Sequence, residues 1–584
     1  MTTCGIEPVT HWQAAPAPSQ EILEAVCQLS RVHPVVARIA ARRMASAGEA
    51  ARWLHPFGDA LPPPLALHHL ELAVERLQQA LEKREELVIF GDYDTDGLTA
   101  TALMEQALSE VGAEVTHFIP DRETEGYGLT AAAMKRCLRE HPFVRVLVTV
   151  DCGITSVAEV AELMQGGIEV IITDHHVPSE QLPAAVAVVN PRLGAPEGAE
   201  ALCGCATAFT VIHALYTRLG RNTYKKYLDL VAVATVADVM PLTGENRALV
   251  KKGLHILSRE GCGNPGLKAL AKLQHVELSK VTAEDLAFRL VPCINAASRI
   301  GDWQRAYELL TCAAPAGKGV FSPAVQQRCE KAARSLDAAN KERREIETRL
   351  RQKVEISGVP PGSKVIIAAG RAQEGFLSGV LGIVAARLVE QHHLPAVVCC
   401  RKDDGRVCGS MRSKGAWHAV KALETVADLC EHFGGHAAAA GFTLRPGTFE
   451  AFCNRLPLAF AACDATPDVL AYEEDLASPI DSELWAGLQV LEPCGTGNPK
   501  PRFAKIFTLL AHRVIGKDKT HLSLKLRETH TAAAPELEAI WFGGAHRAES
   551  WQEGMRLRVL FSLSEDRLQS GRLKLNIVDA FPIP

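Results

Sequence analysis

The stretch LVIFGDYDTDG, residues 87–97, decides the fold class of this chain. Its first part is a short, unbroken apolar run, which is typical of a strand buried on both faces of a parallel sheet. Directly after that run, three aspartates stand at alternate positions, Asp92, Asp94 and Asp96, and a helical pattern follows at 98–111. The order strand, acidic loop, helix predicts the first repeat of an α/β fold.

The same alternation continues outward from this stretch. Helices are expected at 71–83 and 130–140, and strands at 115–119, 144–151 and 185–190. Strands that alternate with helices of this length predict a doubly wound parallel sheet. Beyond this region, the pattern is mostly helical.

The chain of 584 residues is too long for one hydrophobic core, since single cores stop growing at roughly 250–300 residues. A long charged helical stretch predicts a connector rod, and several short strands near the end predict a small β-barrel. The expected segments are an N-terminal cap or arm at 1–70, the doubly wound domain at 71–300, the helical connector at 301–358, a second and smaller α/β domain at 359–460 and the barrel at 465–584.

The composition is that of a soluble globular enzyme, with 47% hydrophobic and 22% charged residues. No run reaches the roughly 18 apolar residues of a membrane span, and no secretory signal pattern opens the chain. We therefore expect a cytoplasmic protein with no membrane segment. The net charge of −5 means that any binding of nucleic acid would depend on local basic patches or bound metal ions.

The chain holds 17 cysteines, but no two have C-x-x-C spacing. Scattered cysteines in a long cytosolic chain are usually reduced and buried as small apolar residues. We expect this for all of them, with neither a disulfide nor a zinc site.

Acidic residues and histidines stand at the ends of several predicted apolar runs. Besides the first acidic loop, they are Asp151, Asp174, His175, His176 and Asp238. Each one alone is equally well explained as a helix cap or a surface residue. Together they would crowd the sheet edge where α/β folds bind ligands, and crowded carboxylates repel one another unless a cation neutralises them. The set predicts two divalent ions, Mn²⁺ or Mg²⁺, and hydrolysis of a phosphate ester.

Four segments resemble, in order, the signature motifs of the DHH phosphoesterase family: DYDTDG at 92–97, VTVDCG at 148–153, TDHH at 173–176 and TVADVMPL at 235–242. Other segments resemble the branch of that family that carries a second domain, called DHHA1, and degrades single-stranded DNA. These are EGYGL at 125–129, INAASR at 294–299, GVLGIVAARL at 379–388, GSMRS at 409–413, FGGHAAAAGF at 433–442 and LEPCGTGNPKPRF at 491–503.

This resemblance implies a DHH domain, a DHHA1 domain and a C-terminal barrel of the OB type. It also implies a metal-dependent 5′–3′ exonuclease that releases nucleoside 5′-monophosphates from single-stranded DNA, acting as a monomer in DNA repair and recombination. The implied partners are single-stranded DNA, a single-stranded-DNA-binding protein and a RecQ-type helicase.

The resemblance also assigns metal ligands. Asp94 and Asp151 would hold one ion, while Asp96, Asp151, His175 and Asp238 would hold the other, so that Asp151 bridges the two.

Three further residues receive catalytic roles from the resemblance. Asp92 would lie near the first ion, and Asp174 would orient a ligating histidine. His176 would contact the scissile phosphate or act as an acid.

A glycine-rich block and nearby polar residues are candidates for holding phosphates, because glycines let backbone N–H groups approach phosphate oxygens closely. The alternative for the block is a closely packed helix, and for Arg299 it is a surface charge at a helix end. The candidates are Asn295, Arg299, Ser410, Arg412, Gly434, Gly435 and His436.

Aromatic residues of the barrel are candidates for stacking on bases, as OB-type folds use them. They are Phe503, Trp541 and Phe542. The alternative for at least two of them is burial in the core.

This chain departs from the branch at several positions. A Trp-His pair is often found before the GVLGI segment, and here Leu377 stands at the position of that histidine. Cys152 replaces a common Asn, Ser298 a usual Gly and Met411 a small residue. We expect catalysis to be retained and the grip on the substrate or the choice of partner to differ.

Two other functions stay open at this point. The same chemistry acts on short RNA or cyclic dinucleotides in smaller DHH relatives, but these lack a C-terminal barrel. A decayed DHH core could serve as a non-catalytic scaffold that binds nucleic acid, but decay would remove carboxylates, and all of them are present here.

Overall fold

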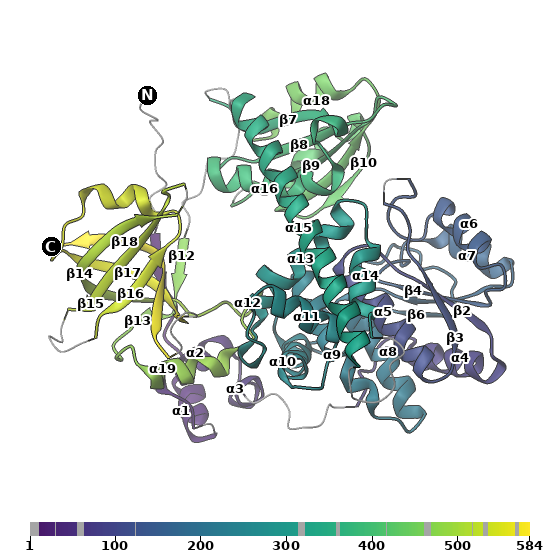
Figure 1. Ribbon diagram of the computed structural model, residues 1–584, viewed down its shortest axis with the longest axis horizontal. Helices are drawn as coiled ribbons and strands as arrows, with labels where there is room; N and C mark the ends of the chain where they lie inside the picture. Colours follow the sequence, from purple (N-terminus) through teal and green to yellow (C-terminus); the bar gives the residue numbers. More distant parts are fainter. Residues whose placement is uncertain are drawn as a thin grey trace. The chain divides into compact units, whose positions relative to one another are not determined.

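The structure is a computed structural model that describes residues 11–29, 31–54, 63–122, 124–313, 322–357, 362–415, 417–460, 469–516, 518–529, 535–566 and 571–584. It divides into two compact units, which Figure 1 shows: residues 63–466 form one, and residues 1–62 together with 467–584 form the other. The segment expected as a separate N-terminal arm is thus grouped with the C-terminal barrel. The expected boundaries near 359 and 465 lie outside the described residues.

The predicted doubly wound parallel sheet is confirmed in the larger unit. Its strands lie in the order β3-β2-β4-β5-β6, and every neighbouring pair is parallel. The central strand β4 is buried along its whole length, and β2 and β5 are buried at every residue after their first, as expected of a parallel sheet covered on both faces. The bounds are β2 Glu86–Phe90, β3 Glu114–Phe118, β4 Val146–Val150, β5 Glu169–Thr173 and β6 Ala187–Val189.

Helices cover both faces of this sheet. On one face, α6 (Ala131–Glu140) and α7 (Val157–Gln165) pack buried side chains against β2, β4 and β5 in one apolar cluster. Three other helices contact strands of the same sheet but contribute nothing to that cluster, so they cover the opposite face. They are α4 (Leu70–Lys83), α5 (Thr95–Glu110) and α8 (Gly204–Arg218).

The predicted connector is confirmed as α15, a single helix of 35 residues at Pro323–Ser357. It packs against helices that follow the parallel sheet and also against α16 of the second α/β domain, so it links the two. The preceding helices are α9 (Leu228–Ala237), α10 (Gly244–Ser258), α11 (Pro265–Leu273), α13 (Val291–Arg299) and α14 (Gln304–Thr311). Within the described part of the chain, no helix has both the length and the apolar character needed to cross a membrane.

One expectation about the cysteines is wrong. Cys312 and Cys329 form a disulfide, and their Cα atoms lie 5.5 Å apart. No short spacing announces this pair, because packing of α14 on α15 brings together two residues that are 17 positions apart. The other cysteines in the described ranges are free thiols, as expected.

The second α/β domain is a mixed five-stranded sheet in the order β10-β11-β9-β8-β7. Only β7 and β8 are parallel, and α16 (Ser378–His392) packs on β8 and β9. The bounds are β7 Ile366–Arg371, β8 Ala396–Arg401, β9 Val407–Arg412, β10 Cys430–Gly435 and β11 Ala439–Leu444. The glycine-rich block therefore forms the antiparallel hairpin of β10 and β11, and the helical alternative for it is wrong.

The smaller unit contains the predicted barrel, which is confirmed. Its strands run β13-β14-β15-β16-β18-β17, and pairing of β14 with β17 closes the ring. The bounds are β13 Glu474–Asp475, β14 Phe503–Ile515, β15 His521–Glu528, β16 Leu537–Trp541, β17 Arg556–Glu565 and β18 Leu573–Ile583. In the same unit, β1 (His11–Ala14) pairs with β12 (Val469–Tyr472).

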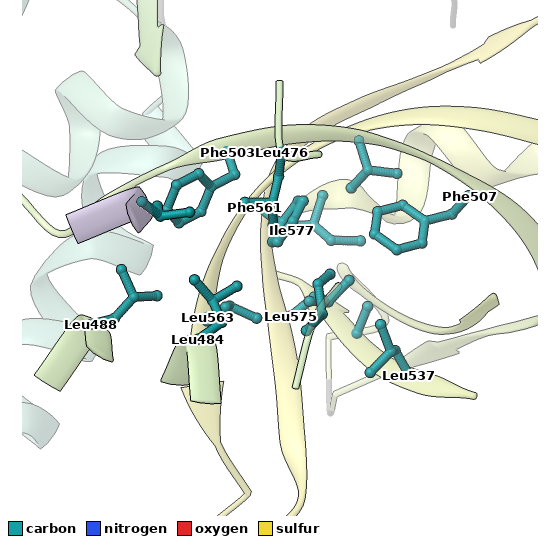
Figure 2. Close-up of a cluster of buried hydrophobic side chains, with 14 of the residues drawn as sticks. Leu476, Leu484, Leu488, Phe503, Phe507, Leu537, Phe561, Leu563, Leu575 and Ile577 are labelled. Atoms are coloured by element: carbon teal, nitrogen blue, oxygen red, sulfur yellow. The ribbon is translucent and has the colours of Figure 1, made fainter. Parts of the chain in front are cut away.

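The barrel core is completed by helices from both ends of the chain. Figure 2 shows Leu484 of α19 (Ser482–Leu488) beside Leu563 of β17, and Leu488 of the same helix belongs to the same buried cluster. The N-terminal helices contribute to the same buried cluster and are coloured purple beside the yellow strands in Figure 1. They are α1 (Gln20–Leu29), α2 (Pro34–Arg43) and α3 (Ala47–Leu54). Each is amphipathic, so burying its apolar face here removes that face from water.

Candidate metal centre

The acidic residues predicted at strand ends meet at the carboxyl edge of the parallel sheet. Asp92 follows β2, Asp151 follows β4, and Asp174, His175 and His176 follow β5. Because these strands are parallel and adjacent, their carboxyl ends lie side by side. Two more ligands come from helix ends that point at this edge: Asp94 caps α5 by accepting a hydrogen bond from Gly97 N at 3.0 Å, and Asp238 caps the end of α9.

The side chains form three groups in which one nitrogen or oxygen atom of each residue lies within 4.8 Å of the others. The first group is Asp92, Asp94 and Asp151. The second is Asp96, His175 and Asp238. The third is Asp151, His175 and His176. The structure therefore brings together all the residues expected as ligands, and Asp151 belongs to two of the groups.

Asp96 is fixed by a part of the chain that the sequence reasoning missed. Its two carboxylate oxygens accept hydrogen bonds from Gly204 N at 2.7 Å and Cys205 N at 2.8 Å, the first amides of α8. The positive end of the helix dipole favours a negative charge there. Gly204 also leaves room for Asp151, since a Cβ at this position would lie 2.4 Å from Asp151 Oδ1. The one available signal was the CGCA sequence that opens a helical pattern.

Burial and mutual repulsion disfavour the ionised form of the clustered carboxyls. Burial first, and then neighbouring aspartates, raise the pKa of Asp92, Asp94 and Asp151. The same causes raise the pKa of Asp238 to about 8. Burial lowers the pKa of His175, which favours the neutral imidazole that binds metal.

Several buried atoms of this cluster have no hydrogen-bond partner among the described residues. They are Asp92 Oδ1, Asp151 Oδ1, Asp238 Oδ2 and His175 Nδ1. His175 Nε2 lies 3.1 Å from Asp151 Oδ1, but the contact lacks the angles of a hydrogen bond. Buried polar atoms are costly unless paired, and carboxylate oxygens with a minority of imidazole are the ligand set of Mn²⁺ and Mg²⁺. The residues present therefore fit a pair of such ions.

Asp174 lies beside the cluster, and its carboxylate contacts the ring of His176 and not the ring of His175. Its Oδ1 lies 2.8 Å from His176 Nδ1 and accepts from the backbone N–H of His175, while Oδ2 accepts from Ile154 N at 2.9 Å. Burial disfavours the charged form of His176, but the bond to Asp174 outweighs it and raises the pKa of His176.

The backbone of the two histidines is held by the turn after β6, which the sequence reasoning also missed. Asn190 Nδ2 donates to His176 O at 3.0 Å, and Arg192 Nε donates to His175 O at 2.8 Å. The NPRL sequence of this turn follows a predicted strand, but nothing in it announces contacts with residues 14 and 17 positions earlier.

Two of the phosphate-binding candidates lie on α13. Arg299 is partly buried where α13 contacts α16, and it donates to Gly379 O at 2.9 Å. Burial, and then repulsion from Arg122, Arg343 and Arg412, lowers the pKa of Arg299 to about 10. An arginine withdrawn from water and surrounded by other arginines is a site that an anion would stabilise. Asn295 has a different position, because its Oδ1 accepts from Thr95 N and Oγ1 and so supports the acidic loop.

The remaining candidates lie on adjacent strands of the second sheet. Arg412 Nη1 donates to Ser410 Oγ at 2.8 Å, and Ser410 pairs with Gly441, which in turn pairs with Gly434. Ser410, Gly441 and Gly434 thus form a row across β9, β11 and β10, and Arg412 stands two positions further along β9, opposite Ala439. The neighbour Gly435 is the last residue of β10 and pairs with Ala440. His436 begins the turn of the hairpin, and its backbone N–H donates to Ala439 O. Within the described residues, no hydrogen bond or ion pair joins Gly434, Gly435 or His436 to the carboxylates.

The departures from the family pattern all have a place in the fold. Cys152 and Met411 are completely buried, and Ser298 Oγ donates to Tyr93 O in the acidic loop. Leu377 is the residue before α16 and makes no side-chain cap to that helix. None of the four adds a charged side chain, and the Ser298 hydroxyl supports the acidic loop.

The aromatic candidates of the barrel divide into core and surface. Phe503 and Trp541 are buried in the barrel core, whereas Phe542 is 67% exposed and its ring lies 5.2 Å from that of His521. Near it is a pocket of about 710 Å³ whose lining contains imidazole, guanidinium and ammonium groups and no carboxylate. The lining residues are His512, Arg513, Val514, Lys519, Thr520, Gly543, Ala545, His546 and Trp551.

Comparisons with known proteins agree with this architecture. The profile described as "DHH family, N-terminal domain" matches residues 86–235, "DHHA1 domain" matches 362–461 and "RecJ OB domain" matches 476–579. The single-stranded-DNA-specific exonuclease RecJ of Bacillus subtilis is 32% identical over 559 residues, which cover 94% of this chain and 68% of that protein. The protein of the same name from Escherichia coli is 32% identical over 550 residues, covering 90% of this chain and 91% of that protein.

A solved structure is similar over almost the whole chain. The crystal structure of RecJ from Thermus thermophilus in complex with Mn²⁺ matches with a TM-score of 0.80 and 30% identity, covering 98% of this chain and 79% of that one. A second crystal structure of the same protein, with Mg²⁺, matches with a TM-score of 0.75. On the sequence matches and on the fold, the chain belongs to the RecJ family.

Proposed function

We propose that this chain is a metal-dependent exonuclease that hydrolyses single-stranded DNA from one end. The observation that carries the proposal is the position of Asp151, which lies both with Asp92 and Asp94 and with the two histidines. A carboxylate shared by two ligand groups suits a pair of divalent ions about 3.5–4 Å apart, the arrangement of two-metal nucleases. Membership in the RecJ family supports the substrate, since its members are named for single-stranded DNA.

The ligands divide between two sites. Asp94 and Asp151 would hold one ion, with Asp92 beside them, and the second ion would lie among Asp96, Asp151, His175 and Asp238. When bound, the ions supply positive charge to the phosphate oxygens and make water more acidic. The amides of α8 keep Asp96 in one orientation, so this ligand needs no rearrangement when an ion or a phosphate arrives.

His176 is the residue of the cluster best placed to exchange a proton with the substrate. Its side chain is 45% exposed while that of Asp174 is 1% exposed, so the imidazole reaches solvent and its partner stays fixed behind it. We assign His176 to contact the scissile phosphate or to donate a proton to the leaving oxygen. Asp174 holds the ring and favours its protonated form.

Phosphates of the strand would be held by the second α/β domain and by α13. Arg299 and Arg412 supply positive charge, and Ser410 with the β10–β11 hairpin supplies hydroxyl and backbone N–H donors. A Cβ at Gly434 or Gly441 would meet no atom within 4 Å. The backbone of the hairpin is therefore accessible at these two positions.

The barrel would hold the strand further from the cut. The basic lining of its pocket, together with exposed Phe542, combines charge for the backbone with a ring for a base, as in other OB-type folds. Phe503 and Trp541 serve the core instead. The presence of this barrel favours a DNA strand over short RNA or cyclic dinucleotides as the substrate, and the complete ligand set favours catalysis over a scaffold role.

Finer properties follow from family membership. We propose 5′–3′ polarity, release of nucleoside 5′-monophosphates, a monomeric protein in the cytoplasm and a role in DNA repair and recombination. The proposed partners are a single-stranded-DNA-binding protein and a RecQ-type helicase. The proposed domains are 71–300, 301–358, 359–460 and 465–584, with 1–70 as an N-terminal arm or cap, of which residues 1–62 are grouped with the barrel.

One assay tests the proposal. Oligonucleotides labelled internally and blocked at either the 5′ or the 3′ end are incubated with the protein and Mn²⁺ or Mg²⁺, with a blunt duplex as control. We expect the 3′-blocked strand to be degraded to mononucleotides and the 5′-blocked strand and the duplex to persist. Degradation of the 5′-blocked strand alone would reverse the polarity, and no degradation of any strand would remove the proposed activity.

A further inference from the structure

The EGYGL loop at 125–129 presents one aromatic side chain at the metal centre. Gly126 and Gly128 both have positive φ, 87° and 75°, and so form tight turns on either side of Tyr127. The loop is anchored behind these turns. Arg136 Nε and Nη2 donate to the carboxylate of Glu125 at 2.6 and 2.9 Å, and Thr130 Oγ1 donates to Glu125 O at 3.0 Å. An anchored loop of this kind holds its exposed residue in one place.

The Tyr127 hydroxyl connects the two most important parts of the site. It donates to Asp151 O at 3.1 Å, and it lies 3.2 Å from both Nδ1 and Nε2 of the His176 ring. The two rings meet at an interplanar angle of 69°. A hydroxyl oxygen at the same distance from both ring nitrogens lies over the face of the imidazole, because an oxygen in the ring plane at that position would overlap the carbon between the nitrogens. The hydroxyl therefore donates to Asp151 O and limits the position of the His176 ring by contact with its face.

We infer that Tyr127 is a positioning residue that holds the His176 imidazole over the carboxylate cluster. The inference rests on the proposed function, because it concerns how the proposed proton donor is aimed. Asp174 fixes one side of the ring through Nδ1, and the backbone is fixed by Asn190. Neither contact prevents the His176 ring from tilting. The Tyr127 hydroxyl, which lies at the same distance from both ring nitrogens, does prevent it.

The role explains why a tyrosine stands in this loop. Tyr127 is 48% exposed, so it is not required to fill the core. Its hydroxyl touches the backbone of Asp151 and not the carboxylate, so metal binding does not depend on it. Removing the hydroxyl should therefore affect the turnover step and leave the affinity for metal and strand nearly unchanged.

The test is a double-mutant cycle on the full-length protein with Mn²⁺ and a 3′-blocked single strand. Tyr127→Phe keeps the ring and the loop and removes only the hydroxyl. We expect kcat to fall about tenfold or more, as expected for a misaimed catalytic group, while KM changes less than about twofold. In a His176→Ala background, the same substitution should have no further effect on kcat.

A matched control is Tyr227→Phe, which removes a hydroxyl that donates to Glu110 away from the metal centre. We expect it to keep the wild-type kcat. The rise in unfolding temperature caused by Mn²⁺ should be the same for Tyr127→Phe as for the wild type.

Three results would overturn the inference. They are a wild-type kcat for Tyr127→Phe, an effect of equal size with and without His176, or loss of the Mn²⁺-induced stabilisation, which would indicate a structural role. A wild-type protein that degrades no single strand would instead remove the proposed function, so the two failures are distinguishable.

Discussion

The metal centre and the barrel treat buried carboxylates in opposite ways. In the barrel unit, carboxylates withdrawn from water lie beside cations: Glu474 pairs with Arg38 at 2.6 Å, and Glu528 pairs with Lys505 at 2.9 Å. In the metal centre, Asp92, Asp151 and Asp238 each have a buried oxygen with no hydrogen-bond partner. Removing one partner of a buried ion pair destabilises a fold, because it leaves the other charge unpaired. Buried carboxyl groups without partners that gather at one edge of a sheet indicate a functional site.

This difference leads to a prediction with the largest effect at Asp151. Asp151→Asn keeps the shape of the side chain and removes the charge that both ligand groups share. We expect cleavage to fall by about a thousandfold or more, since two ions lose one ligand together. Strand binding in a gel-shift assay should persist, and the metal-free protein should unfold at the same or a higher temperature, because one source of repulsion is gone. Activity retained in this variant would contradict the ligand assignment.

The next largest effect is expected at Gly204, which supports the centre without being a ligand. In Gly204→Ala the new Cβ would stand 2.4 Å from Asp151 Oδ1 and 2.6 Å from its Cβ, so Asp151 or α8 must move. A displacement of about 1 Å in an active site costs roughly a hundredfold in rate. We expect that loss in kcat, with secondary structure by circular dichroism unchanged. Gly48→Ala in α3 serves as a control that should leave kcat unchanged, because a Cβ there meets only the end of the Arg52 side chain, at 3.8 Å.

Gly204 also shows where prediction from sequence ends. The strands, the connector helix and the barrel were predictable because apolar runs report directly on burial. The clustering of Asp92, Asp151 and His175 was predictable because parallel strands share one carboxyl edge. The amides that hold Asp96 come from residues more than 100 positions away, and no local pattern records that contact.

Two other differences have similar causes. The hairpin of β10 and β11 is rich in glycine and alanine, whose small side chains show neither a helical nor a strand period. For this reason the sequence did not exclude a helix for this block. The N-terminal helices were expected as a separate arm because an amphipathic pattern predicts that one face is buried but does not identify the segment that covers it. Their partner, the barrel, lies at the other end of the chain.

Metal binding should stabilise the larger unit and depend on pH. At a concentration of Mn²⁺ about 100 times Kd, ligand binding contributes about 2.7 kcal/mol to the free energy of unfolding. The raised pKa of Asp238, about 8, means that protonation stabilises the metal-free protein at low pH and that this stability is lost as the pH rises through 8. Protons also compete with metal for the same oxygen.

The measurement is thermal unfolding with and without Mn²⁺ at about pH 6.5 and about pH 8.5. We expect the metal-free unfolding temperature to fall with rising pH and the Mn²⁺-induced increase to grow. An increase that is larger at the lower pH would contradict the cluster of raised pKa values.

Loss of a carboxylate in the barrel should lower stability and leave activity unchanged, the reverse of the effects expected at Asp151. Glu528 accepts from Lys505 Nζ and from Ile480 N, and both side chains of the ion pair are about 15% exposed. Glu528→Gln would leave the ammonium group of Lys505 without its charged partner, at a cost of about 2 kcal/mol. We expect a lower midpoint in urea unfolding for the barrel transition and an unchanged kcat. A variant that keeps its stability would show that the pair contributes nothing measurable.

The smallest effect is expected at the barrel pocket, where function depends on net charge and not on exact geometry. Arg513 and Lys519 line the pocket and are exposed, so replacing both with Glu should leave the fold intact. Each lost phosphate contact lowers the slope of log affinity against log salt by roughly 0.7 for a single strand. We expect strand affinity to fall a few-fold at moderate salt and the salt dependence to become shallower.

The control is Arg556→Glu, which changes a charge of the barrel that does not line the pocket. This variant should keep the wild-type strand affinity and its dependence on salt. If it weakened binding as much, the effect would come from the overall charge of the barrel, and the pocket would have no special role in holding the strand.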